Sequence, residues 1–407
     1  MISLRSRALT RRIGGALLGL IVVVGCSNSR SEGPTSTTPA PVTSEMVADA
    51  STTTVLETTT VLETTTSSTV AVSLPPFPSQ PDDVPWPTED WPVAEWPVEV
   101  DKSVVDAATD VAFADGGVDR VRAVMIVHEG AIVYERYSPS AVDGPDVVMP
   151  SYSMAKSVTA ALIGVLVRDG LLTLEQPAPV PEWHADPDDP RSAITVEQML
   201  HMSTGMEWSD GMEPGADMAA MVADDDGASY AAAQTLTWEP GERFDYNSGT
   251  TTLLARIVGE SAGASPNDTR AFMEEELFDV IGMDPIRTSF DPSGTWEGSH
   301  SADTTAREYA KFGLLHLRGG HWDGTQVLPT EWVDFVRTPS PTNPEYGGHW
   351  WLDPGSPGMF HAIGIRGNVI TVDPAHDLVI VQLGTVPGPL PLAHFEAIYQ
   401  AFATAGS

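Results

Sequence analysis

This sequence of 407 residues contains few positively charged residues and a single cysteine. It holds 21 Lys and Arg against 56 Asp and Glu, which gives a formal net charge of −35. Because such a charge repels phosphate groups, we expect no nucleic-acid partner. The single cysteine, Cys26, cannot form an intrachain disulfide, and a zinc site built from cysteines is excluded as well.

Signatures of metal and nucleotide binding are also missing. The ten histidines show neither His-x-His-x-Asp nor His-Glu-x-x-His spacing, so a metallohydrolase is not expected. No phosphate loop or dinucleotide fingerprint occurs. The sequence therefore predicts a protein without a metal or cofactor. Apolar residues make up 42% of it, enough for a full hydrophobic core.

The first 25 residues have the pattern of an export signal. Four arginines and no acids precede an apolar run at 13–24, which is too short to cross a bilayer as a helix. The run ends in Val23-Val24-Gly25-Cys26, which resembles a bacterial lipobox. We expect cleavage before Cys26, lipidation of that cysteine and an extracytoplasmic location on a cell membrane. An uncleaved anchor with an incidental thiol is the alternative, and the position of the only cysteine favours lipidation.

Residues 26–98 are predicted to lead into the folded domain. Thr, Ser and Pro dominate 27–75, and Val-Leu-Glu-Thr-Thr-Thr occurs twice, so this part is expected to be an extended tether. Trp-Pro pairs then recur every five residues, at 86, 91 and 96. The three tryptophans could form a recognition surface, but we favour a strip whose rings pack on the domain. The domain itself is predicted over 99–407.

Within that domain, β-rich runs occur at both ends and helical patterns in the middle. The predicted strands are 122–127, 131–137, 368–372 and 378–384. The predicted helices are 101–114, 153–168, 195–201, 251–260, 269–281, 303–318 with Asp303 as its N-cap, and a last one from about 392. This order predicts an α/β (α+β) fold with one antiparallel sheet made from both ends of the domain, flanked by helices, and an inserted, mostly helical subdomain.

Ser153-Met154-Ala155-Lys156 is the sharpest chemical signal. Only three lysines exist, and Lys156 lies at the head of an apolar helical run. A Ser and a Lys three residues apart share one helix face. Burial lowers the pKa of a lysine, so that it can accept the proton of a serine nucleophile. The alternative is a capping serine followed by a lysine that reaches solvent.

Two further segments fit the same chemistry. Tyr246, in Phe244–Gly249, could shuttle a proton between the nucleophile and a leaving group, although a core tyrosine is the commoner case. Residues 362–368 place small residues before a predicted strand, where a backbone N–H could help to bind an oxyanion. Arg366 in this segment could grip a substrate carboxylate with two parallel hydrogen bonds, or be an ordinary surface charge.

With these three segments in order, the sequence resembles the serine β-lactamase and penicillin-recognising superfamily over about residues 100–405. The likeness is to its class C-like branch, which includes esterases, D-stereospecific peptidases and 6-aminohexanoate-dimer hydrolases. The resemblance implies that Ser153 is the nucleophile, Lys156 its activating partner and Tyr246 the proton shuttle. It also implies an oxyanion hole made by the N–H groups of Ser153 and Ile365, next to Gly364.

Two departures from the family pattern bear on the substrate. The Tyr-x-Asn of the family is Tyr246-Asn247-Ser248 here, so a hydroxyl stands where a side-chain amide usually holds the substrate. The Lys-Thr-Gly of β-lactamases is replaced by Ala362-Ile363-Gly364, and no lysine follows Lys311. Ser209-Asp210-Gly211 is similar to the Ser-Asp-Asn of class A enzymes but lacks the Asn, and we rank it below Tyr246.

The sequence therefore predicts a serine hydrolase that cleaves a small ester or amide. The alternatives are a β-lactamase or D-peptidase acting on cell-wall-type substrates, and a non-catalytic penicillin-binding-like protein. The oligomeric state is not predicted.

Overall fold

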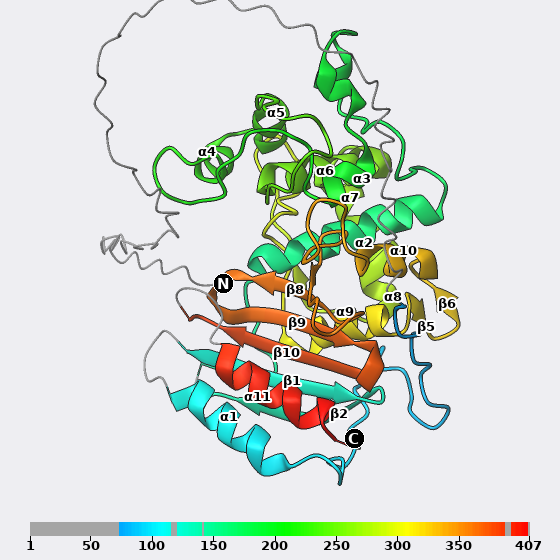
Figure 1. Cartoon of the computed structure of the whole chain (residues 1–407), viewed down its shortest axis with the longest axis vertical. Coiled ribbons are helices and arrows are strands. Elements are labelled where there is room, and N and C mark those ends of the chain that lie inside the picture. The colour runs from blue at the N-terminus through cyan, green and yellow to red at the C-terminus, as the bar shows by residue number, and fades with distance from the viewer. Residues whose placement is uncertain (1–72, 115–119, 141, 387–391, 406–407) are drawn as a thin grey trace, which may run out of the picture. The chain divides into compact units, whose positions relative to one another are not determined.

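A six-stranded antiparallel sheet in the order β2-β1-β10-β9-β8-β7 is the centre of the fold in this computed structural model, which describes residues 73–114, 120–140, 142–386 and 392–405 (Figure 1). The strands come from both ends of the domain, as the sequence predicts. Their bounds are β1 Val121–His128, β2 Ala131–Tyr137, β7 Trp351–Leu352, β8 Phe360–Gly364, β9 Asn368–Asp373 and β10 Leu378–Gly384.

Helices cover both faces of this sheet. Helices α1 (Lys102–Ala114) and α11 (Leu392–Ala403) pack together on one face, and α9 (Ala306–Leu317) packs on the other, against β1, β9 and β10 (Figure 1). The alternation along β1 explains why two layers are possible. Met125 and Val127 join the larger core cluster on the α9 side, whereas Val124 and Ile126 join a smaller cluster with α1 and α11.

The segment between β2 and β7 is mostly helical, as predicted. Helix α2 follows a short 3₁₀ turn, η1 (Tyr152–Met154), and packs against α6 and β8. None of the helices in the described ranges is long and apolar enough to cross a bilayer. The helix bounds in this segment are α2 Ala155–Arg168, α3 Val196–Leu200, α4 Asp217–Ala223, α5 Gly227–Ala232, α6 Ser248–Ala262, α7 Pro266–Met273, α8 Asp279–Ile281 and α10 Thr330–Val336. Two short hairpins complete it, β3 Ile286–Arg287 with β4 Asp303–Thr304, and β5 His321–Trp322 with β6 Thr325–Gln326.

Two helix predictions were wrong in detail. The helix expected over 303–318 begins at Ala306 with Thr305 as its N-cap, because the Thr305 side chain accepts the Glu308 N–H. Asp303 lies instead in β4. The helix expected over 269–281 is α7, a π turn at Glu274–Phe278 and α8, since a wider turn interrupts the ladder.

The Trp-Pro strip packs on the domain, as the sequence favours. Trp86 and Trp91 pack against the larger core cluster and Trp96 against the smaller one. The ring of Trp86 lies 5.0 Å from that of Trp322, and the Trp91 indole donates to the Arg307 carbonyl. Residues 75–98 therefore belong to the same compact unit as the sheet.

Candidate active site

The turn that carries Ser153 is anchored through Ser151, the residue at its start. The Ser151 N–H donates to Asp303 Oδ1 at 2.9 Å, and the Ser151 hydroxyl accepts from the Ala302 N–H. Tyr152 has a φ of +46°, a left-handed conformation that is strained for a residue with a Cβ. Ser153, the next residue, is half-buried in the turn that leads into helix α2.

Lys156, one turn further along, is only 2% exposed. Its ammonium group donates to Ser153 Oγ at 3.2 Å, Ser248 Oγ at 2.8 Å and the Ser299 carbonyl at 3.1 Å. Burial lowers the pKa of Lys156 to about 8, although the negative charge of Asp210 opposes the shift. The lysine is thus poised to exchange a proton with Ser153 near neutral pH. The alternative of a lysine reaching solvent is wrong.

Tyr246 lies close to Lys156, whose Nζ is 5.0 Å from the centre of the tyrosine ring. Burial and the charge of Asp210 raise the pKa of Tyr246, while a hydrogen bond with Ser153 lowers it. The net direction is upward, so the phenol is protonated at neutral pH. Its ring stacks on Trp351 at 5.5 Å and meets Tyr346 edge-on at 6.1 Å, which fixes the direction of the hydroxyl.

The end of β8 approaches the Ser153 turn closely. A Cβ on Gly364 would lie 2.5 Å from the Ser151 carbonyl oxygen, so only glycine allows this approach. Ile365 follows directly and is 60% exposed. Arg366 has a left-handed φ of +68°, and its side chain has neither a hydrogen bond nor an ion pair with any residue that the structure describes.

Ser248 and Asn247 have separate roles at the start of α6. The Asn247 side chain accepts the Thr250 N–H as the N-cap of the helix, and the residue is buried. Ser248 is the first residue of the helix and turns its hydroxyl to Lys156. The hydroxyl that replaces the usual amide therefore contacts the buried lysine.

Two groups near Lys156 were not predicted as site residues. Asp210, ranked below Tyr246, accepts the Ser248 N–H at 3.0 Å, and its charge acts on both Lys156 and Tyr246. His300 follows Ser299, and its pKa is lowered to about 4 by burial and then by the charge of Lys156. Asp210 had a weak signal in its Ser-Asp-Gly context, whereas no local pattern marks His300.

The profile of one protein family, described as Beta-lactamase, matches residues 114–405. The chain belongs to the β-lactamase family.

Similar proteins in this family include a 6-aminohexanoate-dimer hydrolase from Paenarthrobacter ureafaciens, which is 26% identical over 264 residues. The alignment spans 58% of this chain and 66% of that relative, slightly under two thirds of its length.

Solved structures share the fold. A protein from Bacillus anthracis, whose assignment as a 6-aminohexanoate-dimer hydrolase is provisional, is 22% identical with a TM-score of 0.61. The match covers 80% of this chain and 88% of that one. A family VIII carboxylesterase is 16% identical with a TM-score of 0.58, covering 76% and 99% of the two chains.

A second serine pattern in the chain is structural. Residues 259–263 read Gly-Glu-Ser-Ala-Gly, which matches the Gly-x-Ser-x-Gly of α/β-hydrolases. In that fold the serine occupies a strand-to-helix turn, but Ser261 lies in the last turn of α6. Its hydroxyl donates to the Ile257 carbonyl at 2.8 Å, so it is not placed as a nucleophile.

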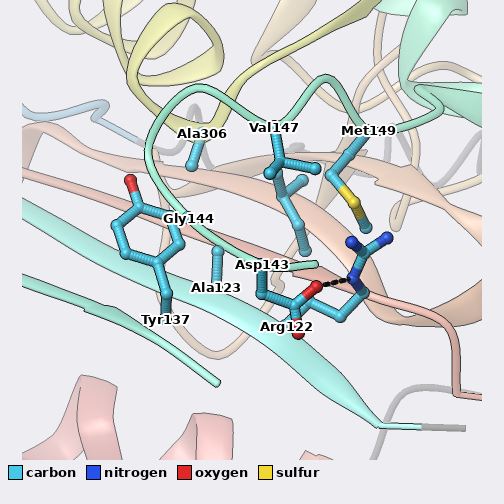
Figure 2. A pocket seen from close by; sticks show the side chains of 9 residues that line it. Arg122, Ala123, Tyr137, Asp143, Gly144, Val147, Met149 and Ala306 are labelled. Carbon is cyan, nitrogen blue, oxygen red and sulfur yellow. Dashed lines mark hydrogen bonds and ion pairs between the residues drawn. The ribbon is translucent and has the colours of Figure 1, made fainter. Parts of the chain in front are cut away.

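A small pocket beside β1 and β2 is likewise separate from the chemistry (Figure 2). Arg122 and Tyr137 are among the residues that line it, and Ser153, Lys156 and Tyr246 are not. Asp143, in the loop after β2, forms ion pairs with Arg122 and Arg120. These ion pairs connect the loop to the sheet. In the ranges that the structure describes, no cluster of His, Cys, Asp or Glu could hold a metal ion.

Proposed function

We propose that this protein is a serine hydrolase that cleaves ester or amide bonds through an acyl-enzyme on Ser153. The observation that carries the proposal is the contact between Ser153 and a buried lysine of lowered pKa, with Tyr246 against both. A structural role does not require these three groups together, and burying a lysine without a function costs stability.

The protonation states of Lys156 and Tyr246 are compatible with acylation of Ser153. At pH 7 a lysine with a pKa of about 8 is neutral in roughly one molecule in ten, and it can take the proton as Ser153 Oγ attacks the carbonyl carbon. The Oγ–C bond forms while the carbonyl oxygen becomes an oxyanion. When the intermediate collapses, the bond to the leaving group breaks and that group takes the Tyr246 proton, which Lys156 replaces. Water then attacks the acyl-enzyme, and the same relay returns the proton to Ser153.

Backbone N–H groups would stabilise the oxyanion. Ser153 stands in the first turn of a helix, where N–H groups have no acceptor within the helix. Ile365, brought close by Gly364, supplies the second candidate donor. We therefore assign the oxyanion hole to the N–H groups of Ser153 and Ile365.

The substrate proposal follows from Arg366. The chain has no Lys-Thr-Gly, and Arg366 is the cation that follows the end of β8. Its guanidinium, which pairs with no residue in the described ranges, can bind a substrate carboxylate in a bidentate manner. We propose linear esters or amides that carry a carboxylate, rather than β-lactams, and the relative named as a 6-aminohexanoate-dimer hydrolase supports an amide substrate.

Covalent labelling tests the nucleophile. A fluorophosphonate probe and p-nitrophenyl esters should react with the wild type and not with Ser153→Ala, whose turnover should fall by about three orders of magnitude or more. Ser261→Ala is the matched control and should keep both reactions. Full turnover by the Ser153→Ala protein would refute the assignment, and a wild type inert to the probe would support a non-catalytic binding protein. Nitrocefin hydrolysis in parallel reports β-lactamase activity.

The Arg366 proposal is tested by paired substrates. Arg366→Ala should raise KM for carboxylate-bearing esters roughly tenfold and leave neutral esters almost unchanged, since a uniform binding contact is lost. Equal losses on both substrate types would contradict it.

We also propose that the protein is a lipoprotein anchored through Cys26, which lies outside the described residues. The proposal rests on the apolar run and lipobox-like sequence alone. Cys26→Ser should leave the precursor uncut or release the protein from membranes. Unchanged membrane fractionation and processing of that variant would refute the anchor.

A further inference from the structure

Asp210 holds the start of helix α6. Its Oδ1 accepts two hydrogen bonds, from the Ser248 N–H at 3.0 Å and from Trp208 Nε1 at 2.9 Å. The Trp208 ring is itself pressed on the helix, because a Cβ on Gly249 would lie 2.6 Å from it. Asp210 is exposed, and its Oδ2 has no hydrogen-bond partner in the part of the chain that the structure describes.

Ser248 connects Asp210 to the buried lysine through two hydrogen bonds. The residue whose N–H binds Asp210 is the residue whose hydroxyl accepts from Lys156 Nζ, at 2.8 Å. Lys156 itself contacts two hydroxyls and a carbonyl but forms no ion pair with any acid in the described ranges. Asp210 is therefore linked to the lysine through Ser248.

We infer that Asp210 is a positioning residue that holds Ser248 against Lys156 and whose charge sets the pH range in which Lys156 and Tyr246 work. This inference rests on the proposed function, because it concerns the same proton relay.

The electrostatics of the site support it. The charge of Asp210 raises the pKa of Lys156 and also that of Tyr246, in each case as the effect second to burial. Removing the charge should therefore move both limbs of a bell-shaped pH profile in one direction, to lower pH. Other titratable or charged groups lie on the segments around this centre: Asp245 and Arg243 before α6, His300 after Ser299, Tyr346 and His349 before β7, and His201 after α3.

Asp210→Asn separates charge from geometry, since the amide oxygen can still accept both hydrogen bonds. The rate of inactivation by an uncharged fluorophosphonate, followed against pH, reports Ser153 activation without a known substrate. We expect both limbs to move to lower pH by roughly half a unit, because Asp210 is exposed and water screens its charge. The maximal rate should change less than threefold.

Three comparisons test the two parts of the inference. Glu207→Gln removes an exposed charge from the same segment, one that does not act on Lys156 or Tyr246, and should leave the profile in place. Asp210→Ala loses the hydrogen bonds too, so kcat for a p-nitrophenyl ester should fall roughly tenfold or more with little change in KM. High salt should move the wild-type profile toward that of Asp210→Asn and leave the variant in place.

The outcomes are separable. An unshifted profile in Asp210→Asn, or an equal shift in Glu207→Gln, would overturn the role of the charge. An Asp210→Ala protein with the kcat of Asp210→Asn would overturn the positioning role, and Asp210→Asn still tests the charge if the alanine variant fails to fold. The proposed function fails by a different result, the retention of turnover in Ser153→Ala.

Discussion

The two faces of the sheet are built for different purposes. On the α1 and α11 side, the core consists of apolar and aromatic side chains such as Ile126, Ile380 and Ile398. On the other side, the core cluster surrounds a chain of buried or half-buried polar groups from α2, α6 and the 299–303 segment. The first face packs α1 and α11 on the sheet, whereas the second, in the proposed function, gives up stability to keep a lysine out of water.

The largest effects are expected on the polar side, where Lys156 and Tyr246 should act as one functional unit. Lys156→Ala and Tyr246→Phe should each lower kcat/KM by about three orders of magnitude, because either change interrupts the same relay. The double variant should lose little more than the worse single variant. A double loss equal to the product of the single losses, measured with p-nitrophenyl esters, would show independent roles.

The apolar side should respond in the opposite way. Ile126→Ala removes a fully buried side chain and should lower the free energy of unfolding by about 3 kcal/mol, with unchanged kcat for the folded fraction. Denaturant unfolding and active-site titration measure the two quantities. Val111→Ala, at a residue 68% exposed on α1, is the control and should cost under about 0.5 kcal/mol. A loss of kcat in Ile126→Ala would mean that the faces are coupled.

Lys156 allows the stability cost of the site to be measured. Its pKa is about 8 in the folded protein against 10.5 for an ordinary lysine, so the unfolded chain binds more protons between these values. The destabilisation is full below pH 8 and is relieved as the pH rises toward 10.5. Lys156→Met should therefore be more stable than the wild type at pH 7, by up to about 3 kcal/mol. The difference should shrink at pH 10, and a constant difference would contradict this account.

A smaller effect concerns the strip at 75–98. A Cβ on Gly282 would lie 1.8 Å from the Thr88 carbonyl oxygen, and Gly282 has a φ of +67°. Gly282→Ala should therefore loosen the strip. It should lower the free energy of unfolding by about 1–2 kcal/mol and the thermal midpoint by several degrees. Gly324→Ala, with a φ of +81° and open space around its Cβ, separates backbone strain from the clash. Equal losses in both variants would mean that the contact with Thr88 adds nothing.

Local sequence patterns predicted most of the helices and strands. Strands β2 and β10, at 131–137 and 378–384, have the bounds that were predicted, because runs of β-branched and apolar residues end at turn residues. Strands β7 and β8 were not predicted, since two- and five-residue strands rich in Gly, Ala and aromatics give little periodic signal. The start of α9 was misplaced because Thr305 and Asp303 are both good N-caps, and only the pairing of β3 with β4 selects one.

The sequence by itself determined the spacing of Ser153 and Lys156, because three residues along a helix fix two side chains on one face whatever surrounds them. It also determined that Tyr246 and Gly364 stand in the right order along the chain. Only the tertiary structure decided that Lys156 is buried, that the Ser248 hydroxyl accepts a hydrogen bond from it and that Asp210 accepts the Ser248 N–H. Burial and long-range contacts depend on how α2, α6 and the 203–216 segment pack together, and packing of segments distant along the chain leaves no local pattern to read.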